Sequence, residues 1–255
     1  MNLKIPYGKT YGLLGPNGAG KTTTIRILNT IISKTSGDAS VGGYNIITQN
    51  EDIRRICGFL PESPGLYSKL TAKEFLEFIG ELYYLPKDVI FARIEELIEI
   101  FGLEGRENDL LESYSRGMKQ KVCLCAALIQ DPEIIFLDEP TSNLDPAAAR
   151  MVKDLISELA KKADKTVFIC THLLDAAEEL CDILGIIVDG EIKIEGTPKE
   201  IIESVGAKDL EEAYLKITGA SHIDDLLAWR DENSNNHEYN NKKQRKRKKK
   251  NKKSR

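Results

Sequence analysis

The sequence predicts an α/β fold in which helices cover a mostly parallel β-sheet and a helical subdomain is inserted into that core. Short runs of β-branched and aliphatic residues alternate with segments of helical periodicity over residues 1–219, as expected for a parallel sheet with crossover helices. At one place two helical segments follow each other with no strand between them. This pair indicates the inserted subdomain, at about residues 64–127.

The strands expected in the core are short and mostly apolar: Thr10–Leu14, Ile56–Leu60, Glu133–Leu137, Thr166–Cys170 and Ile183–Val188. Core helices are expected at Lys21–Ile31 and at Pro146–Lys162, the second with Asp145 as its N-cap. The dipeptide Asp189-Gly190 favours a hairpin that ends with a further strand, Glu191–Glu195.

The two consecutive helices of the expected subdomain carry clear start and stop signals. Thr71 and Glu74 form a capping box, a pair in which each side chain bonds the backbone N–H of the other residue, and this box opens a helix to about Tyr84. After Pro86, apolar residues at helical spacing predict a second helix that ends at Gly102.

Composition and charge exclude some classes of function. Residues 242–255 hold 11 of the 36 Lys and Arg and no acidic residue, so residues 1–241 carry 25 basic against 40 acidic side chains. An acidic body makes nucleic acid an unlikely partner, because a phosphate backbone selects basic surfaces. The five scattered cysteines are interpreted as reduced packing residues. Residues 220–255 are expected to form an extension that ends in a disordered basic tail.

A glycine-rich segment between the first strand and the first helix fits the pattern G-x-x-x-x-G-K-[ST]. Such a loop wraps its backbone N–H groups around phosphates at a helix N-terminus. Lys21 can reach the β- and γ-phosphates, and Thr22 can ligate Mg²⁺. The sequence thus predicts a P-loop NTPase core. The residues expected to bind the nucleotide here are Gly15, Pro16, Asn17, Gly18, Ala19, Gly20, Lys21, Thr22 and Thr23.

A second motif is the apolar strand that ends in Asp138 and Glu139. Carboxylates at the end of a buried strand are costly unless a cation pairs with them. We therefore expect Asp138 to hold Mg²⁺, directly or through water, and Glu139 to activate the attacking water. A strand that simply ends in a polar turn is the alternative, which the upstream phosphate loop disfavours.

From about Leu3 to Gly219 the chain resembles the ABC ATPases. Tyr114–Gln120, shortly before the Asp138 strand, is similar to the family signature Leu-Ser-Gly-Gly-Gln and to its Tyr-Ser-Lys-Gly-Met variant in exporters of the ABC-2 type. The resemblance implies that Ser115 and Gly117 contact the γ-phosphate of ATP held by the opposite subunit.

Three further residues gain a role from the same resemblance. Asp145 lies in the loop that crosses the dimer interface, and His172 is similar to the switch histidine that touches the γ-phosphate. Glu62 stands where the family has a glutamine between the core and the helical subdomain. It is expected to ligate Mg²⁺ or position water, and to sense the ATP state.

The resemblance implies an ATP-hydrolysing subunit that powers a membrane exporter, with ATP and Mg²⁺ as cofactors. It implies a membrane-spanning permease on a separate chain, because no apolar run here approaches the roughly 20 residues of a spanning helix. The assembly would be a homodimer, or a heterodimer with another ABC ATPase. The subunit would be cytoplasmic and peripheral on the inner face of the cell membrane.

Two alternatives stay open at this point. One is a soluble ABC ATPase that acts on ribosomes or nucleic acid. The other is a non-functional fragment, because only 14 residues precede Gly15, whereas relatives begin with another strand and an aromatic residue that stacks on adenine. Tyr7 and Tyr11 are too close to Gly15 to be that residue. The N-terminal β subdomain is therefore expected to be truncated.

Overall fold

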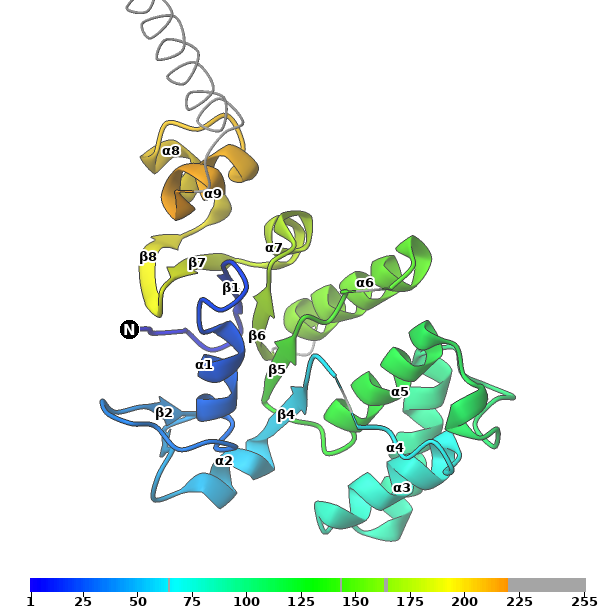
Figure 1. The fold of residues 1–255 in the computed structure, drawn as a ribbon. Helices are drawn as coiled ribbons and strands as arrows, with labels where there is room; N and C mark the ends of the chain where they lie inside the picture. Colours follow the sequence, from blue (N-terminus) through cyan, green and yellow to red (C-terminus); the bar gives the residue numbers. More distant parts are fainter. Residues whose placement is uncertain (64, 143, 163–164, 220–255) are drawn as a thin grey trace, which may run out of the picture.

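Six strands form the main sheet of the computed structural model, which describes residues 1–63, 65–142, 144–162 and 165–219. Their order in space is β4-β5-β6-β1-β7-β8, and the first five are mutually parallel while β8 is antiparallel to β7 (Figure 1). The strands are β4 (Cys57–Leu60), β5 (Ile134–Asp138), β6 (Thr166–Thr171), β1 (Thr10–Leu14), β7 (Ile183–Val188) and β8 (Glu191–Gly196). The loops that follow β1, β4, β5 and β6 consequently gather at one edge of the sheet.

Helices cover both faces of this sheet, which explains why its parallel strands are apolar throughout rather than alternating. Leu13 and Phe136 pack on the face covered by α1 (Lys21–Leu28) and α2 (Asn50–Ile56). Their neighbours Leu14 and Leu137 pack on the opposite face, which α5 (Arg116–Leu128), α6 (Pro146–Lys162) and α7 (Leu174–Leu180) cover. The expected α/β core with a mostly parallel sheet is confirmed.

The inserted helices lie between β4 and β5 in the chain, as predicted, and stand beside the sheet (Figure 1). They are α3 (Ala72–Leu82), α4 (Lys87–Ile100) and α5, with a short 3₁₀ turn at Leu111–Ser113 before α5. The capping box of Thr71 and Glu74 is formed by both of its hydrogen bonds. Gly102, with φ +57°, follows α4 and stops it.

Some boundaries differ from the sequence prediction. The helix expected over Lys21–Ile31 ends at Leu28, because Thr30 leaves the helical conformation with φ +58°. The side chain of the C-cap residue Asn29 donates to the carbonyl of Ile25 in the last turn. The strands β5 and β6 each run one residue further than expected. Asp138 stays in register with Cys170 across the parallel pair, so sheet pairing extends these strands to the polar residues at their ends.

The C-terminal part of the described chain begins with the predicted hairpin of β7 and β8. Asp189 (φ +49°) and Gly190 (φ +77°) form its two-residue turn, which requires positive φ at both positions. Two helices follow, α8 (Pro198–Ser204) and α9 (Leu210–Thr218). The expected extension over residues 220–255 lies outside the described residues.

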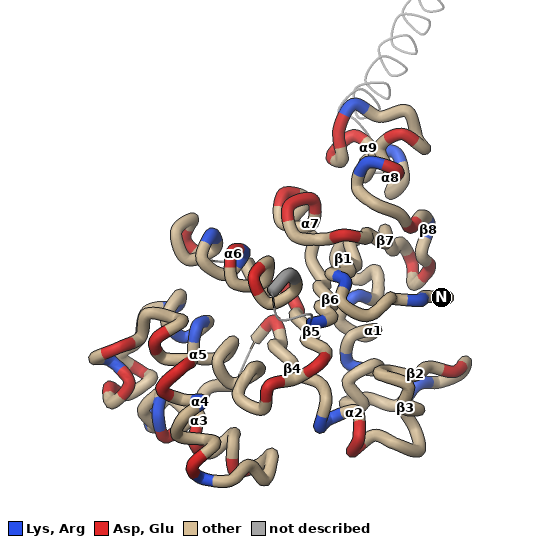
Figure 2. The backbone as a smooth tube through the Cα atoms, turned by 180° about the vertical axis from the view of Figure 1, so that it is seen from behind, with Lys and Arg blue, Asp and Glu red and all other residues tan. Residues whose placement is uncertain are grey.

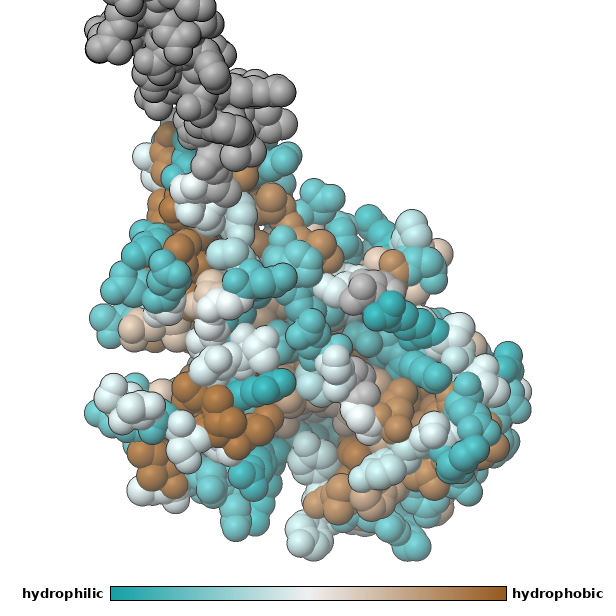
Figure 3. Space-filling model, in the orientation of Figure 1, coloured by the Kyte–Doolittle hydropathy of each residue, from teal (hydrophilic) through white to brown (hydrophobic). Residues whose placement is uncertain are grey.

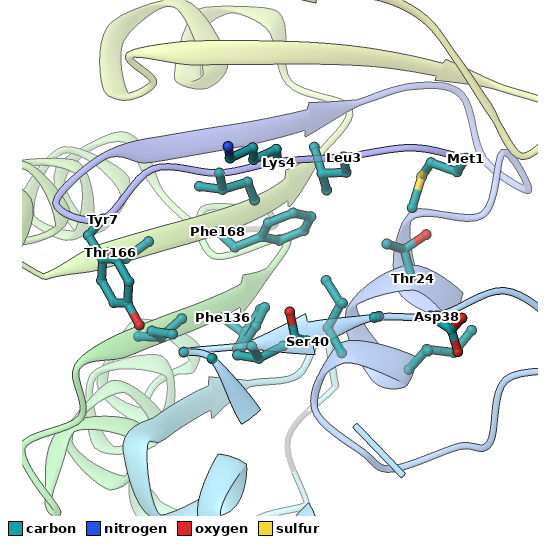
Figure 4. Close-up of a pocket in the computed structure, with 18 residues that line it drawn as sticks. Met1, Leu3, Lys4, Tyr7, Thr24, Asp38, Ser40, Phe136, Thr166 and Phe168 are labelled. Carbon is teal, nitrogen blue, oxygen red and sulfur yellow. The ribbon is translucent and has the colours of Figure 1, made fainter. Parts of the chain in front are cut away.

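A pocket of about 480 Å³ lies on the α1 side of the sheet, away from the loops at the strand ends (Figure 4). The N-terminal segment, α1, the strand β2 (Ser40–Val41) and the side chains of Phe136 and Phe168 line it. The strand β2 pairs with β3 (Tyr44–Asn45) in a small separate sheet. Tyr7 lines this pocket, whereas Tyr11 is fully buried. Within the described chain, none of Gly15–Thr23 lines the pocket, so it is not the predicted phosphate site.

Candidate active site

The phosphate loop connects β1 to α1 and is shaped by its glycines. Gly18 (φ +84°) and Gly20 (φ +105°) adopt backbone conformations that favour glycine. A Cβ on Gly15 would lie 2.3 Å from the carbonyl oxygen of Ile187, so only glycine fits where the loop passes β7. The first turn of α1 contains no acidic residue, which leaves its N-terminus favourable for an anion.

Lys21 is buried and folded back over the loop. Its Nζ donates to the carbonyl of Gly15 at 2.7 Å and to that of Pro16 at 3.1 Å. These two carbonyls therefore satisfy the ammonium group in this conformation. A bound phosphate would replace these neutral acceptors with a charged one, so both partners of the hydrogen bond would then carry charge.

Asp138 is 1% exposed and reaches the start of α1 from the end of β5. The hydroxyl of Thr22 donates to its Oδ1 at 3.3 Å, whereas Oδ2 has no hydrogen-bond partner among the described residues. Burial raises the pKa of this carboxyl above its ordinary value of 3.8, the Thr22 hydrogen bond lowers it, and the nearby Glu62 and Glu139 raise it further. An unpartnered, buried carboxylate oxygen beside a threonine hydroxyl fits a hard cation such as Mg²⁺.

No group of three or more His, Cys, Asp or Glu side chains is placed to hold a metal by itself in the described part of the chain. This agrees with Mg²⁺ in nucleotide sites, where one or two protein groups act together with phosphate oxygens and water. Thr22 and Asp138 are the pair in contact. Glu62 follows β4, is exposed, and forms no hydrogen bond or ion pair within the described residues. Its charge acts on Asp138, so it lies near Thr22 and Asp138 without contacting either side chain.

Glu139 directly follows β5 and has an unusual backbone conformation. Its φ is +53°, which is rare for a residue other than glycine, and its N–H donates to the carbonyl of Cys170 on β6 at 2.8 Å. Such strain at a strand end costs about 1–3 kcal/mol and is typical of functional positions. His172 lies directly after β6, and its Nδ1 is 2.7 Å from Oε1 of Glu139.

The other oxygen of Glu139 accepts two hydroxyl groups. Thr171 donates to Oε2 at 3.0 Å and Ser142 at 2.9 Å. Sequence reasoning did not single out Thr171. Its place as the last strand residue before His172 was the only available signal, because the contact depends on how β5 and β6 pair.

The signature residues form a second group beside the first. Ser115 is the N-cap of α5 and accepts from the N–H of Met118. A Cβ on Gly117 would lie 3.3 Å from that of Ala148, so the signature helix passes close to the start of α6. Asp145 caps α6, as predicted, by accepting from the N–H groups of residues 147 and 148. Within the described chain, neither Ser115 nor Gly117 hydrogen-bonds to the phosphate loop.

A search of protein families matches residues 1–142 to the family described as "ABC transporter". The chain belongs to this family. It is 36% identical over 216 residues to the "ABC transporter ATP-binding protein NatA" of Bacillus subtilis (strain 168), covering 84% of this chain and 87% of that protein. It is 39% identical over 211 residues to the "Bacitracin transport ATP-binding protein BcrA" of Bacillus licheniformis, covering 83% and 68% of the two chains.

Solved structures agree with this membership. An ATP-binding cassette, solved as a dimer in a post-hydrolysis state with ADP and Pi bound, matches with a TM-score of 0.70 and 28% identity over 77% of this chain and 88% of that one. The protein is an ABC ATPase, and the matched residues 1–142 contain its phosphate loop and the carboxylates of Asp138 and Glu139.

All five cysteines of this ABC ATPase are free and buried. Burial raises the pKa of Cys57, Cys123 and Cys181 to about 12, which suppresses the reactive thiolate form. The prediction that they pack rather than react agrees with these positions.

Proposed function

We propose that this ABC ATPase powers a membrane exporter by binding and hydrolysing ATP. The observation that carries the proposal is the convergence of Lys21, Thr22, Asp138, Glu139 and His172 at one edge of the sheet, beside an unpartnered oxygen of Asp138. The names of its relatives support a transport role, since they include a bacitracin transport protein and a linearmycin resistance protein.

In the proposed reaction, Lys21 leaves the carbonyls of Gly15 and Pro16 and binds the β- and γ-phosphates. Thr22 and Asp138 would hold Mg²⁺, and Glu62, whose charge acts on Asp138, would contribute through water. Mg²⁺ supplies positive charge against the phosphates when it is bound. Glu139 accepts a proton from the attacking water while His172 donates to the γ-phosphate.

The site as proposed is completed by a second subunit. Ser115 is exposed and Gly117 is half-buried at the start of α5, which carries favourable N–H groups and no acidic residue in its first turn. They would contact the γ-phosphate on the opposite subunit, with Asp145 near the interface. Two copies of this chain, or this chain and another ABC ATPase, would enclose two ATP molecules.

The helical subdomain, proposed to span residues 64–127 of a domain over 1–219, offers an apolar surface for a permease. Tyr67 is 57% exposed and its ring contacts the edge of the Phe78 ring, with centroids 5.7 Å apart. Exposed apolar side chains of this subdomain are visible on the molecular surface (Figure 3). Tyr67 follows Glu62 closely in the chain, so a permease bound here would sit next to the residue proposed to sense ATP.

No helix among the described residues is long and apolar enough to cross a membrane. We infer that a separate permease chain holds the protein at the inner, cytoplasmic face of the membrane. Acidic and basic residues are interspersed along the described backbone (Figure 2), which does not favour nucleic acid as a partner. The names of the relatives likewise do not favour a ribosomal role or a non-functional fragment.

Affinity purification of the full chain from detergent-solubilised cells tests the transport role. Recovery of a polytopic membrane protein in a fixed ratio with the ATPase is expected. Recovery of ribosomes without any membrane protein, through an association that RNase disrupts, would contradict the exporter proposal and support the soluble alternative.

A further inference from the structure

The carboxylate of Glu139 is held unequally at its two oxygens. Oε2 accepts from the hydroxyls of both Thr171 and Ser142, whereas the one hydrogen-bond partner of Oε1 among the described residues is the ring of His172. Because each carboxylate oxygen offers about two lone-pair positions, Oε2 is filled by protein groups. The remaining capacity to accept a hydrogen bond from water lies on Oε1.

Thr171 is suited to hold this carboxylate in one orientation. Its side chain is 1% exposed at the end of β6, and its Oγ1 also accepts from the N–H of Leu173 at 3.0 Å. Since that acceptor position is occupied by a backbone donor, the hydroxyl hydrogen is directed to Glu139. A β-branched residue in a strand has few side-chain rotamers, which fixes the donor further.

Ser142 holds the same oxygen from the other side of the turn. Its backbone N–H donates to the carbonyl of Glu139 at 3.2 Å, and its Oγ donates to Oε2. Ser142 thus closes the turn that follows β5 with its backbone and hydrogen-bonds the Glu139 carboxylate with its side chain. Together with Thr171 it joins the ends of β5 and β6 through a single oxygen atom.

We propose that Thr171 and Ser142 are positioning residues that reserve Oε1 of Glu139 for the attacking water. In the structure His172 contacts that oxygen through Nδ1 at 2.7 Å. When His172 turns to the γ-phosphate, Oε1 becomes free while Oε2 stays bound, so the carboxylate does not rotate with the histidine. This inference rests on the proposed role of Glu139 as the base, and it adds the two hydroxyl groups that orient its carboxylate.

Steady-state ATPase kinetics of Thr171→Val test the inference, because valine keeps the shape of threonine and removes its hydroxyl. We expect kcat to fall by roughly 10- to 100-fold, the usual worth of a hydrogen bond to a charged group, with an unchanged KM for ATP. Thr171→Ser keeps the hydroxyl and should retain most of the turnover. Ser142→Ala should lower kcat less, because Ser142 is only half-buried.

A matched control is Thr166→Val at the other end of β6. The Thr166 hydroxyl accepts from the N–H of Gly8, and the residue is also buried, at 7% exposure. This variant should lose stability without losing turnover. A similar fall in kcat for Thr166→Val and Thr171→Val would assign the effect to the strand rather than to Glu139, and would overturn the proposal.

The double variant Glu139→Gln with Thr171→Val distinguishes a role of Thr171 in orienting the Glu139 carboxylate from a general effect on the structure. Once the carboxylate of Glu139 is removed, the Thr171 hydroxyl no longer orients a base. Adding Thr171→Val should therefore cause no further loss of turnover and no loss of ATP-induced dimer. A further loss of either would contradict the proposal. If Glu139→Gln lowers turnover but Thr171→Val does not, only the positioning role fails. If Glu139→Gln itself leaves turnover unchanged, the assignment of the base fails with it.

Discussion

Nδ1 of His172 lies 2.7 Å from Oε1 of Glu139, across the carboxyl ends of the neighbouring strands β6 and β5. The two residues proposed to act on water and on the γ-phosphate thus engage each other in this conformation. Lys21 is likewise engaged with the carbonyls of Gly15 and Pro16. ATP binding would exchange these internal contacts for contacts with phosphate, which links nucleotide binding to the assembly of the catalytic arrangement.

Replacing His172 by alanine should leave ATP binding intact and slow hydrolysis. Loss of a hydrogen bond to the charged γ-phosphate predicts a fall in kcat of roughly 10- to 100-fold. Steady-state phosphate release measures the turnover, and a fluorescent ATP analogue measures the binding. Unchanged turnover in a protein that binds nucleotide normally would remove His172 from the site.

Replacing Lys21 by alanine should abolish phosphate binding. The ammonium group supplies the positive charge nearest the phosphates, and the carbonyls it now contacts cannot take over that role. Isothermal titration with ATP compares the variant with Lys199→Ala, whose side chain is exposed on α8. Equal ATP affinity in both variants would contradict the interpretation of the phosphate loop.

Asp138 should make the nucleotide-free protein less stable as pH rises. Its folded-state pKa lies above the ordinary value of 3.8, so the folded state binds more protons than the unfolded state between these two values. Stability therefore falls as pH rises through that window and stays lower above it. Asp138→Asn should raise the Tm of the nucleotide-free protein at neutral pH and abolish Mg²⁺-dependent hydrolysis.

Thermal unfolding between pH 4 and pH 7, with and without Mg²⁺ and ATP, checks both parts of this prediction. Mg²⁺ with ATP should raise the Tm of the wild-type chain more than that of Asp138→Asn, because a ligand stabilises the state that binds it. A lower Tm for Asp138→Asn in the nucleotide-free protein at neutral pH would mean that the buried carboxylate is not a source of instability.

The sequence was sufficient to predict the parallel core and the edge where the site forms. Residues that directly follow apolar strands, such as Glu139 and His172, must meet because the carboxyl ends of parallel strands share one edge. The approach of Thr22 to Asp138 follows from the same rule. Asp145 and Thr71 were predicted as helix caps because capping depends on residues two or three positions apart.

Contacts that depend on strand register were not predictable. The bond from Thr171 to Glu139 exists because Asp138 pairs with Cys170, which brings the next residues of both strands together. The contact of Lys21 with its own loop depends on side-chain conformation, which the spacing of residues in the motif does not determine. The early end of α1 was missed because the left-handed backbone conformation of Thr30 is a local feature that helical periodicity does not encode.

The most direct test of the account is size-exclusion chromatography of Glu139→Gln with and without Mg-ATP. Loss of the base should lower turnover by roughly 10²- to 10⁴-fold while leaving the phosphate contacts of Lys21 and Thr22 in place. ATP should therefore accumulate between two subunits and shift the protein from monomer to dimer. A protein that stays monomeric and shows no ATP binding would contradict the composite site built from the phosphate loop of one subunit and Ser115 and Gly117 of the other.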